Sequence, residues 1–149
     1  MRSFGAYLGK QLRAGDYLVL NGQLGAGKTT FTQGLGAGMQ VMGQVTSPTF
    51  VVSRIHKSQK NMPELIHIDA YRLSDATQLL DLDLEDHPNS VVVMEWGAPY
   101  ITSLTDEWLQ VDITRDSEIN DQDPASGVRQ VELTAFGNRW RELDFSEWS

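Results

Sequence analysis

The feature that most constrains this chain is a glycine-rich segment at residues 22–29, which matches the pattern G-x-x-x-x-G-K-[ST] in full. A short apolar run at residues 17–20, typical of a buried strand, leads directly into it, and a helical pattern follows at residues 28–39. At ordinary glycine frequencies, a chance match somewhere in 149 residues has odds of about one in two hundred. Strand, loop and helix together predict a phosphate-binding loop.

The residue types of this loop suit the phosphates of a nucleotide. Glycines at positions 22, 25 and 27 permit positive φ and close approach of the backbone, so that consecutive N–H groups and the start of a helix face an anion. Lys28 supplies a point charge for the β- and γ-phosphates, and the hydroxyl of Thr29 can ligate Mg²⁺. We therefore expect the loop to bind a nucleotide.

The rest of the chain alternates strand and helix patterns without an internal repeat. Gly34, Gly36 and Gly38 weaken the helix after the loop, and we interpret them as a frayed helix end. The polar, acidic segment 115–127 is expected to be a hairpin loop or disordered. Further strands are expected at residues 50–56, 65–69, 91–94, 108–114 and 128–134, and helices at residues 3–15, 74–80 and 135–143.

This order of elements predicts an α/β fold. We expect a P-loop NTPase three-layer α/β/α architecture with a mixed, mainly parallel sheet, a central strand at residues 91–94 and antiparallel C-terminal strands. A length of 149 residues fits one P-loop domain spanning residues 1–149.

Composition excludes several classes of function. The chain has no cysteine, which excludes disulfides, thiolate zinc sites and cysteine nucleophiles. No apolar run approaches the roughly 20 residues that cross a bilayer, and residues 1–13 lack the pattern of a signal peptide, so we expect a cytoplasmic protein without a membrane partner.

The net charge is −8, from 12 basic and 20 acidic side chains, which argues against non-specific electrostatic binding of nucleic acid. The first 60 residues are basic and the remainder is acidic. We therefore expect docking to basic protein surfaces and little nucleic-acid binding by the chain alone.

Two acids are candidates for the metal side of the site. Asp69 and Glu95 each end an expected strand, and carboxylates there lie at the ligand edge of an α/β sheet, although either can also be an exposed strand-end acid. Residues 46–49, Thr-Ser-Pro-Thr, form either a rigid, hydroxyl-rich sensor of the γ-phosphate or only a turn.

Two of the three neighbours of these acids have two interpretations each. His67 shares a strand face with Asp69 and is either a support for the site or a packed core histidine. Arg72 either stabilises phosphate charge or is an ordinary surface arginine, and Trp96 is interpreted as a packing residue.

Four blocks occur in order along the chain, G-Q-L-G-A-G-K-T-T-F at residues 22–31, T-S-P-T-F at 46–50, H-I-D-A-Y-R at 67–72 and V-M-E-W-G at 93–97. In this order they resemble the TsaE (YjeE) family, small P-loop ATPases used in making threonylcarbamoyladenosine in tRNA. A weaker similarity around Arg129 and Arg139 extends the resemblance over about residues 15–140.

The resemblance implies a set of functional residues. Lys28, Asp69 and Glu95 would be catalytic, with Asp69 as the Walker B acid and Glu95 contacting Mg²⁺ or orienting the attacking water. Thr29, Asp69 and Glu95 would be the protein's metal ligands. ATP would be bound by Gly25, Ala26, Gly27, Lys28, Thr29, Thr30 and, in a switch loop, Thr46 and Thr49.

The resemblance also implies a partner, a TsaD/TsaB-like threonylcarbamoyltransferase heterodimer that this chain resets by hydrolysing ATP. A small-metabolite kinase is the rival function, but such kinases use a lid with several arginines, and residues 103–149 hold only four within an acidic stretch. A GTPase is disfavoured because neither Asp-x-x-Gly nor Asn-Lys-x-Asp occurs. Asp69 and Glu95 together disfavour a scaffold that binds nucleotide without turnover.

Overall fold

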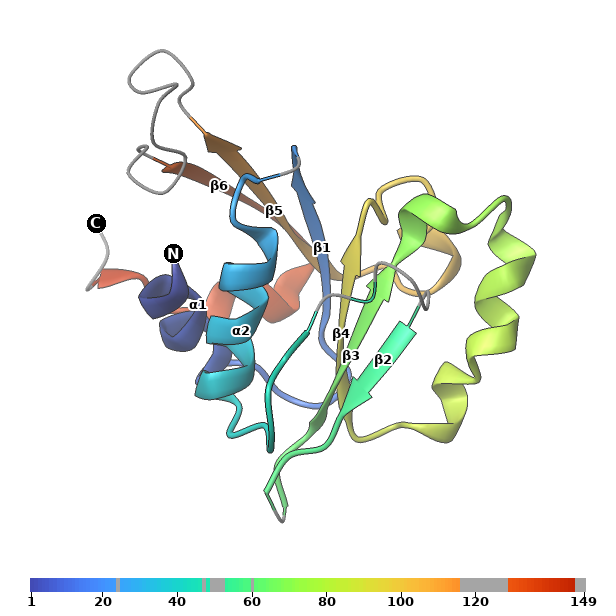
Figure 1. Ribbon diagram of the computed structural model, residues 1–149, viewed down its shortest axis with the longest axis horizontal. Helices are drawn as coiled ribbons and strands as arrows, with labels where there is room; N and C mark the ends of the chain where they lie inside the picture. Colours follow the sequence, from blue (N-terminus) through green and yellow to red (C-terminus); the bar gives the residue numbers. More distant parts are fainter. Residues whose placement is uncertain (24, 47, 49–52, 60, 116–128, 147–149) are drawn as a thin grey trace.

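The computed structural model describes the whole chain except residues 24, 47, 49–52, 60, 116–128 and 147–149. Its centre is one six-stranded sheet in the order β2-β3-β4-β1-β5-β6 (Figure 1). In chain order the strands are β1 (Tyr17–Gly22), β2 (Ser53–His56), β3 (Glu64–Asp69), β4 (Ser90–Glu95), β5 (Trp108–Arg115) and β6 (Arg129–Phe136).

The pairing of these strands confirms a mixed, mainly parallel sheet. Strands β3, β4, β1 and β5 run parallel, while β6 pairs antiparallel with β5. The expected antiparallel C-terminal pair is therefore present, although β5 itself runs parallel to β1. A second antiparallel edge, β2 against β3, was not expected from the sequence. All six residues of β4 are buried, as expected for a central strand.

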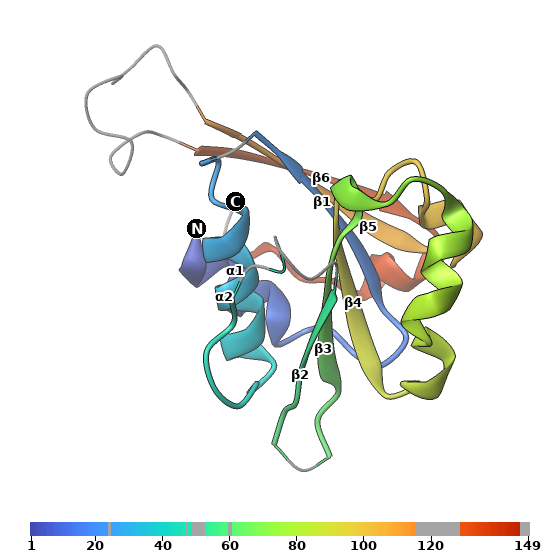
Figure 2. The same cartoon turned by 45° about the vertical axis from the view of Figure 1, so that its right-hand side comes forward.

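Two layers cover the sheet and complete the predicted three-layer arrangement. Helices α1 (Arg2–Gly9) and α2 (Lys28–Gly38) lie side by side on one face (Figure 2). Their core, with Leu8, Phe31 and Leu35, packs on the inward side chains of β1, β4 and β5. Each such fully buried side chain contributes roughly 1.5–3 kcal/mol. The 3₁₀ helices η1 (Ala70–Arg72), η2 (Ala76–Leu82), η3 (Leu84–Asp86) and η4 (Ile101–Ser103) belong with the opposite face.

Two expected helices differ from the prediction. The segment expected as an α-helix at residues 74–80 is the 3₁₀ helix η2, which Asp75 caps by accepting from the backbone N–H of Thr77 at 2.9 Å. The C-terminal segment begins as strand, because β6 runs on to Phe136, whose ring stacks on Trp108 at 4.3 Å. Only after Gly137, at φ 102°, does the 3₁₀ helix η5 (Asn138–Glu142) follow. Cross-strand packing thus outweighs local helix preference there.

The N-terminal helix is also shorter than predicted. Helix α1 ends at Gly9, and backbone N–H groups of Gln11 and Leu12 then donate to carbonyls three residues back. This tighter turn still brings Leu12 into the core at 8% exposure.

The glycines of α2 form a close-packed surface, so their interpretation as a frayed helix end is wrong. A Cβ on Gly34 would overlap the backbone carbonyl of Arg2, and one on Gly38 would overlap that of Ala6. The reciprocal glycine on α1, Gly5, lies equally close to the carbonyl of Phe31. Helices α1 and α2 approach closely because these positions carry no side chain.

Two of the expected segments lie partly outside the described residues. Of the expected strand at 50–56, residues 50–52 fall there, as does almost all of the 115–127 segment. The acids of residues 81–86 are exposed, as expected for a surface segment. Within the described part of the chain, no helix has the length and apolar character needed to cross a membrane.

Candidate functional site

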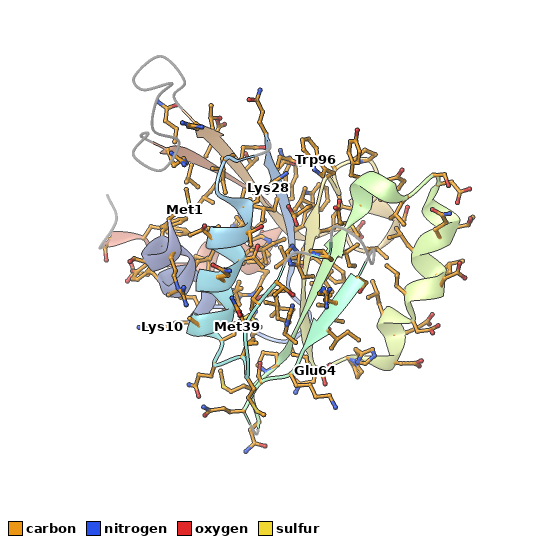
Figure 3. The ribbon with its side chains drawn as sticks, viewed as in Figure 1. Met1, Lys10, Lys28, Met39, Glu64 and Trp96 are labelled. Atoms are coloured by element: carbon orange, nitrogen blue, oxygen red, sulfur yellow. The ribbon has the colours of Figure 1, made fainter. Side chains whose placement is uncertain are left out.

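A cavity of about 900 Å³ opens where the carboxyl ends of β1, β3 and β4 meet the start of α2. In Figure 3, Lys28 and Trp96 lie at this end of the sheet and Glu64 lies at the other. This is the ligand edge expected for an open α/β sheet. The cavity is lined by Gln23, Gly25, Gly27, Lys28, Thr29, Thr30, Asp69, Tyr71, Glu95, Trp96 and Arg129.

The loop between β1 and α2 has the backbone that an anion site needs. Gly25 has φ 82°, and Gly27, with φ 110°, is the residue from which α2 starts. Helix N–H groups at such a start have no partner within the helix and face the cavity with the positive end of the dipole.

Gly22 differs from the expectation of positive φ, because it ends strand β1 and has no left-handed conformation. It is needed for close approach instead, since a Cβ there would lie 3.0 Å from the Ile113 carbonyl oxygen and 3.1 Å from the Cβ of Ala26.

The side chain of Lys28 is held inside the site. It is 9% exposed, with Nζ 3.7 Å from Oε1 of Glu95 and 4.2 Å from the ring centroid of Trp96. The first contact is a Coulomb attraction, and the second places the ammonium over the electron-rich face of the indole. A cation is therefore fixed at the end of the phosphate loop.

Glu95 lies at the centre of the constellation. It is 6% exposed, and its Oε2 is 2.7 Å from Nε2 of His67. Burial raises the pKa of Glu95, but the hydrogen bond and charge of His67 together with Lys28 outweigh it and hold the pKa below its ordinary value. Glu95 is therefore an ionised acceptor at neutral pH.

Asp69 lies beside Glu95 in the sheet, since the two residues are register partners on β3 and β4. Its Oδ1 accepts from the backbone N–H of Tyr71 at 3.1 Å and caps η1. The cap fixes one carboxylate oxygen at the cavity wall.

The donor set around the cavity suits Mg²⁺. The hydroxyl of Thr29 and the carboxylates of Asp69 and Glu95 are hard oxygen ligands, and all three residues line the same cavity. No cluster of three or more His, Cys, Asp or Glu side chains able to hold a metal occurs among the described residues. A site of this kind takes its remaining ligands from substrate phosphates and water, as Mg²⁺ sites usually do.

The chain matches the family model "Threonylcarbamoyl adenosine biosynthesis protein TsaE" over residues 1–123. The chain belongs to the TsaE family. A Streptomyces coelicolor tRNA threonylcarbamoyladenosine biosynthesis protein TsaE is 48% identical over 149 residues, covering 98% of this chain and 97% of that protein. The Bacillus subtilis protein of the same name is 37% identical over 131 residues, covering 88% and 77%.

A solved structure agrees with this assignment. The crystal structure of Bacillus subtilis YdiB superposes with a TM-score of 0.71 at 31% identity, covering 94% of this chain and 81% of that one. The family resemblance and the P-loop fold predicted from the sequence are both confirmed. As a TsaE protein, the chain belongs to the biosynthesis of threonylcarbamoyladenosine in tRNA.

The structure places most of the predicted TsaE site residues in the cavity. Ala26 is buried and is not among the lining residues of the described chain. Thr46 is exposed and is not among the lining residues of the described chain, and Thr49 lies outside the described residues. The cavity brings together Gly25, Gly27, Lys28, Thr29, Thr30, Asp69 and Glu95.

For three of the residues that line the cavity, the sequence predicted either no role or a different role. Trp96, interpreted as a packing residue, is 38% exposed and contacts Lys28, and Tyr71 lies 5.9 Å from it, ring centroid to ring centroid. Arg129 reaches the site from β6 and donates from Nε to the carbonyl oxygen of Ala26 at 3.0 Å. In the sequence, only the weak TsaE-like similarity around Arg129 pointed to this residue. Arg129 and Ala26 are far apart along the chain, so no local pattern predicts their contact.

Proposed function

We propose that this TsaE protein is a Mg²⁺-dependent ATPase, weak alone, that acts as a nucleotide switch on a TsaD/TsaB-like threonylcarbamoyltransferase heterodimer. The observation that carries the proposal is the Lys28–Glu95 pair beside Asp69, inside the cavity formed by the phosphate loop. A lysine for phosphate charge and two carboxylates are the groups that nucleotide hydrolysis requires at such a loop.

Each group has a role in this proposal. Backbone N–H groups of residues 25–30 and the ammonium of Lys28 bind the ATP phosphates. Thr29, Asp69 and Glu95 would hold Mg²⁺, which neutralises charge on the phosphate oxygens when it is bound. Glu95, already ionised, orients the attacking water by accepting a hydrogen bond from it. The water oxygen bonds to the γ-phosphorus, and the bond from the γ-phosphorus to the bridging oxygen breaks with its electron pair left on ADP. The protons of the water leave on the phosphate and to solvent.

We propose that the loop of Thr46 and Thr49 is the nucleotide-sensing switch. Since Thr46 is exposed away from the cavity lining, this role requires Thr46 to move toward the γ-phosphate when ATP binds. Hydrolysis then releases the loop, so that the partner complex meets different loop conformations in the ATP-bound and ADP-bound states.

The partner surface follows from charge. The acids of residues 81–86 are exposed in the segment of η2 and η3, which lies on the face of the sheet opposite α2 (Figure 2), and they suit a basic protein surface. We propose that the chain works in the cytoplasm as one domain over residues 1–149 and that it binds tRNA weakly on its own. Submicromolar tRNA binding by the isolated chain at near-physiological salt would contradict this part of the proposal.

ATP hydrolysis by the purified chain tests the catalytic part of the proposal. We expect slow phosphate release that requires Mg²⁺ and is absent in Lys28→Ala. The same reactions, supplied with a mixture of small metabolites and searched for new phosphate esters, test the alternative of a metabolite kinase. Arg129 is the one arginine among the lining residues in the described chain, which does not provide the several arginines of a kinase lid.

A further inference from the structure

His67 is a buried histidine. From the sequence it could be either a support for the site or a packed core residue. It lies on β3, paired with Val93 of β4 on one side and Arg54 of β2 on the other, and its exposed fraction is 0%. Its Nε2 is 2.7 Å from Oε2 of Glu95. Because strands hold His67 from both sides, the position of its ring relative to Glu95 is fixed by the sheet.

The direction of this hydrogen bond follows from its partner. The ionised carboxylate of Glu95 can only accept, so Nε2 of His67 is the donor. Nδ1 is buried and has no hydrogen-bond partner within the described part of the chain. The contact with Glu95 is therefore the one hydrogen bond of the ring among the described residues.

Glu95 is consequently held through both of its oxygens. Lys28 attracts Oε1 at 3.7 Å, and His67 donates to Oε2 at 2.7 Å. Phosphates that enter the cavity compete with Glu95 for Lys28, because they carry more negative charge. Among the described residues, His67 is then the one that still holds Glu95.

We propose that His67 is a positioning residue for the reaction, keeping the carboxylate of Glu95 at the cavity wall when Lys28 turns to the phosphates. The proposal rests on the ATPase function proposed above. It predicts that His67 acts on turnover and hardly on nucleotide binding, because His67 is not among the residues that line the cavity.

Three variants separate this role from a purely structural one. His67→Leu fills the volume without a donor, and His67→Gln offers an amide N–H in place of Nε2–H. The matched control is His87→Leu, which breaks another histidine–glutamate pair, His87 Nδ1 to Glu64 Oε2 at 3.1 Å, at the opposite end of β3.

We expect kcat for ATP to fall about ten- to hundredfold in His67→Leu, the range for losing one hydrogen bond to a charged group. The Kd for ATP should change less than about threefold. His67→Gln should recover most of kcat, and His87→Leu should leave it unchanged. In a Glu95→Gln background, His67→Leu should lower kcat no further, since the two residues act as a unit.

Parallel loss of kcat, affinity and thermal stability in both His67 variants would instead show a packing role and overturn the proposal. The donor is tested independently of activity by the ¹⁵N shifts of the His67 ring. A proton on Nε2 supports the proposal, and an unprotonated Nε2 overturns it. A wild-type chain that never hydrolyses ATP would overturn the proposed function, while the ¹⁵N shifts would still decide whether His67 donates to Glu95.

Discussion

The ammonium of Lys28 lies 3.7 Å from Oε1 of Glu95 and 4.2 Å from the ring centroid of Trp96. The cation of the loop and the acid proposed to act on water thus form one ion pair inside the cavity. In the proposed function, the phosphates of ATP would compete with Glu95 for Lys28 and so free the carboxylate.

Lys28→Ala should abolish productive Mg-ATP binding. The substitution removes the buried point charge while leaving the backbone N–H groups of the loop, which alone bind phosphate weakly. Calorimetric titration with Mg-ATP measures the loss, and Lys10→Ala, at an exposed lysine beyond the end of α1, is the control. Affinity in Lys28→Ala equal to that of the Lys10 control would show that this lysine does not hold the phosphates.

Glu95→Gln should separate binding from turnover. Hydrolysis is expected to fall at least about a hundredfold, as for loss of a group that acts in the transition state. ATP affinity should be kept or increased, because Lys28 then has no carboxylate to leave. Rapid-quench turnover and equilibrium titration on the same sample make the comparison. Retained turnover would mean that another residue orients the water.

Two glycines of α2, one facing α1 and one facing away from it, give a graded test of the fold. Gly34→Ala should lower the free energy of unfolding by about 1–3 kcal/mol, because its Cβ would meet the rigid carbonyl of Arg2. Gly36→Ala should cost less, since its Cβ would meet a side-chain methyl of Val45 at 2.8 Å, and alanine favours the helix by up to about 1 kcal/mol. Urea titration of both variants checks the order, and a reversed order would refute the close helix contact.

A buried ion pair joins the C-terminal segment to the first turn of the fold. The guanidinium of Arg139 meets Asp16 through two hydrogen bonds of 2.8 and 2.9 Å, with both side chains at most 9% exposed. Arg139→Leu should destabilise by about 3–5 kcal/mol, because the Asp16 charge is left buried. Arg13→Leu, which breaks an exposed pair with Glu142, should cost about 0–1 kcal/mol. Similar melting temperatures for the two variants would contradict this difference.

The sequence was most informative where structure is local. The phosphate loop, the strand before it and the helix after it depend on neighbouring residues, so Lys28 and Gly27 could be placed from their pattern alone. Alternation of strands and helices also predicted the layers and the central β4. Asp69 and Glu95 followed from strand ends, which share one edge of a parallel sheet.

Other features depend on packing between distant segments. Nothing local shows that Gly34 meets the carbonyl of Arg2 or that Arg129 reaches the carbonyl of Ala26. The extension of β6 to Phe136 depends on a ring stack with Trp108, against a helical pattern in its own segment. The role of His67 needed the 2.7 Å contact with Glu95, since a core histidine and a site histidine look alike in sequence.

The most direct test of the central claim is the rate of ATP hydrolysis by this chain with and without the TsaD/TsaB-like heterodimer, with tRNA modification followed in the same reaction. We predict slow hydrolysis alone, faster hydrolysis with the heterodimer, and repeated rounds of threonylcarbamoyladenosine formation that stop with Lys28→Ala. Hydrolysis unaffected by the heterodimer, or sustained tRNA modification with the Lys28 variant, would contradict the account.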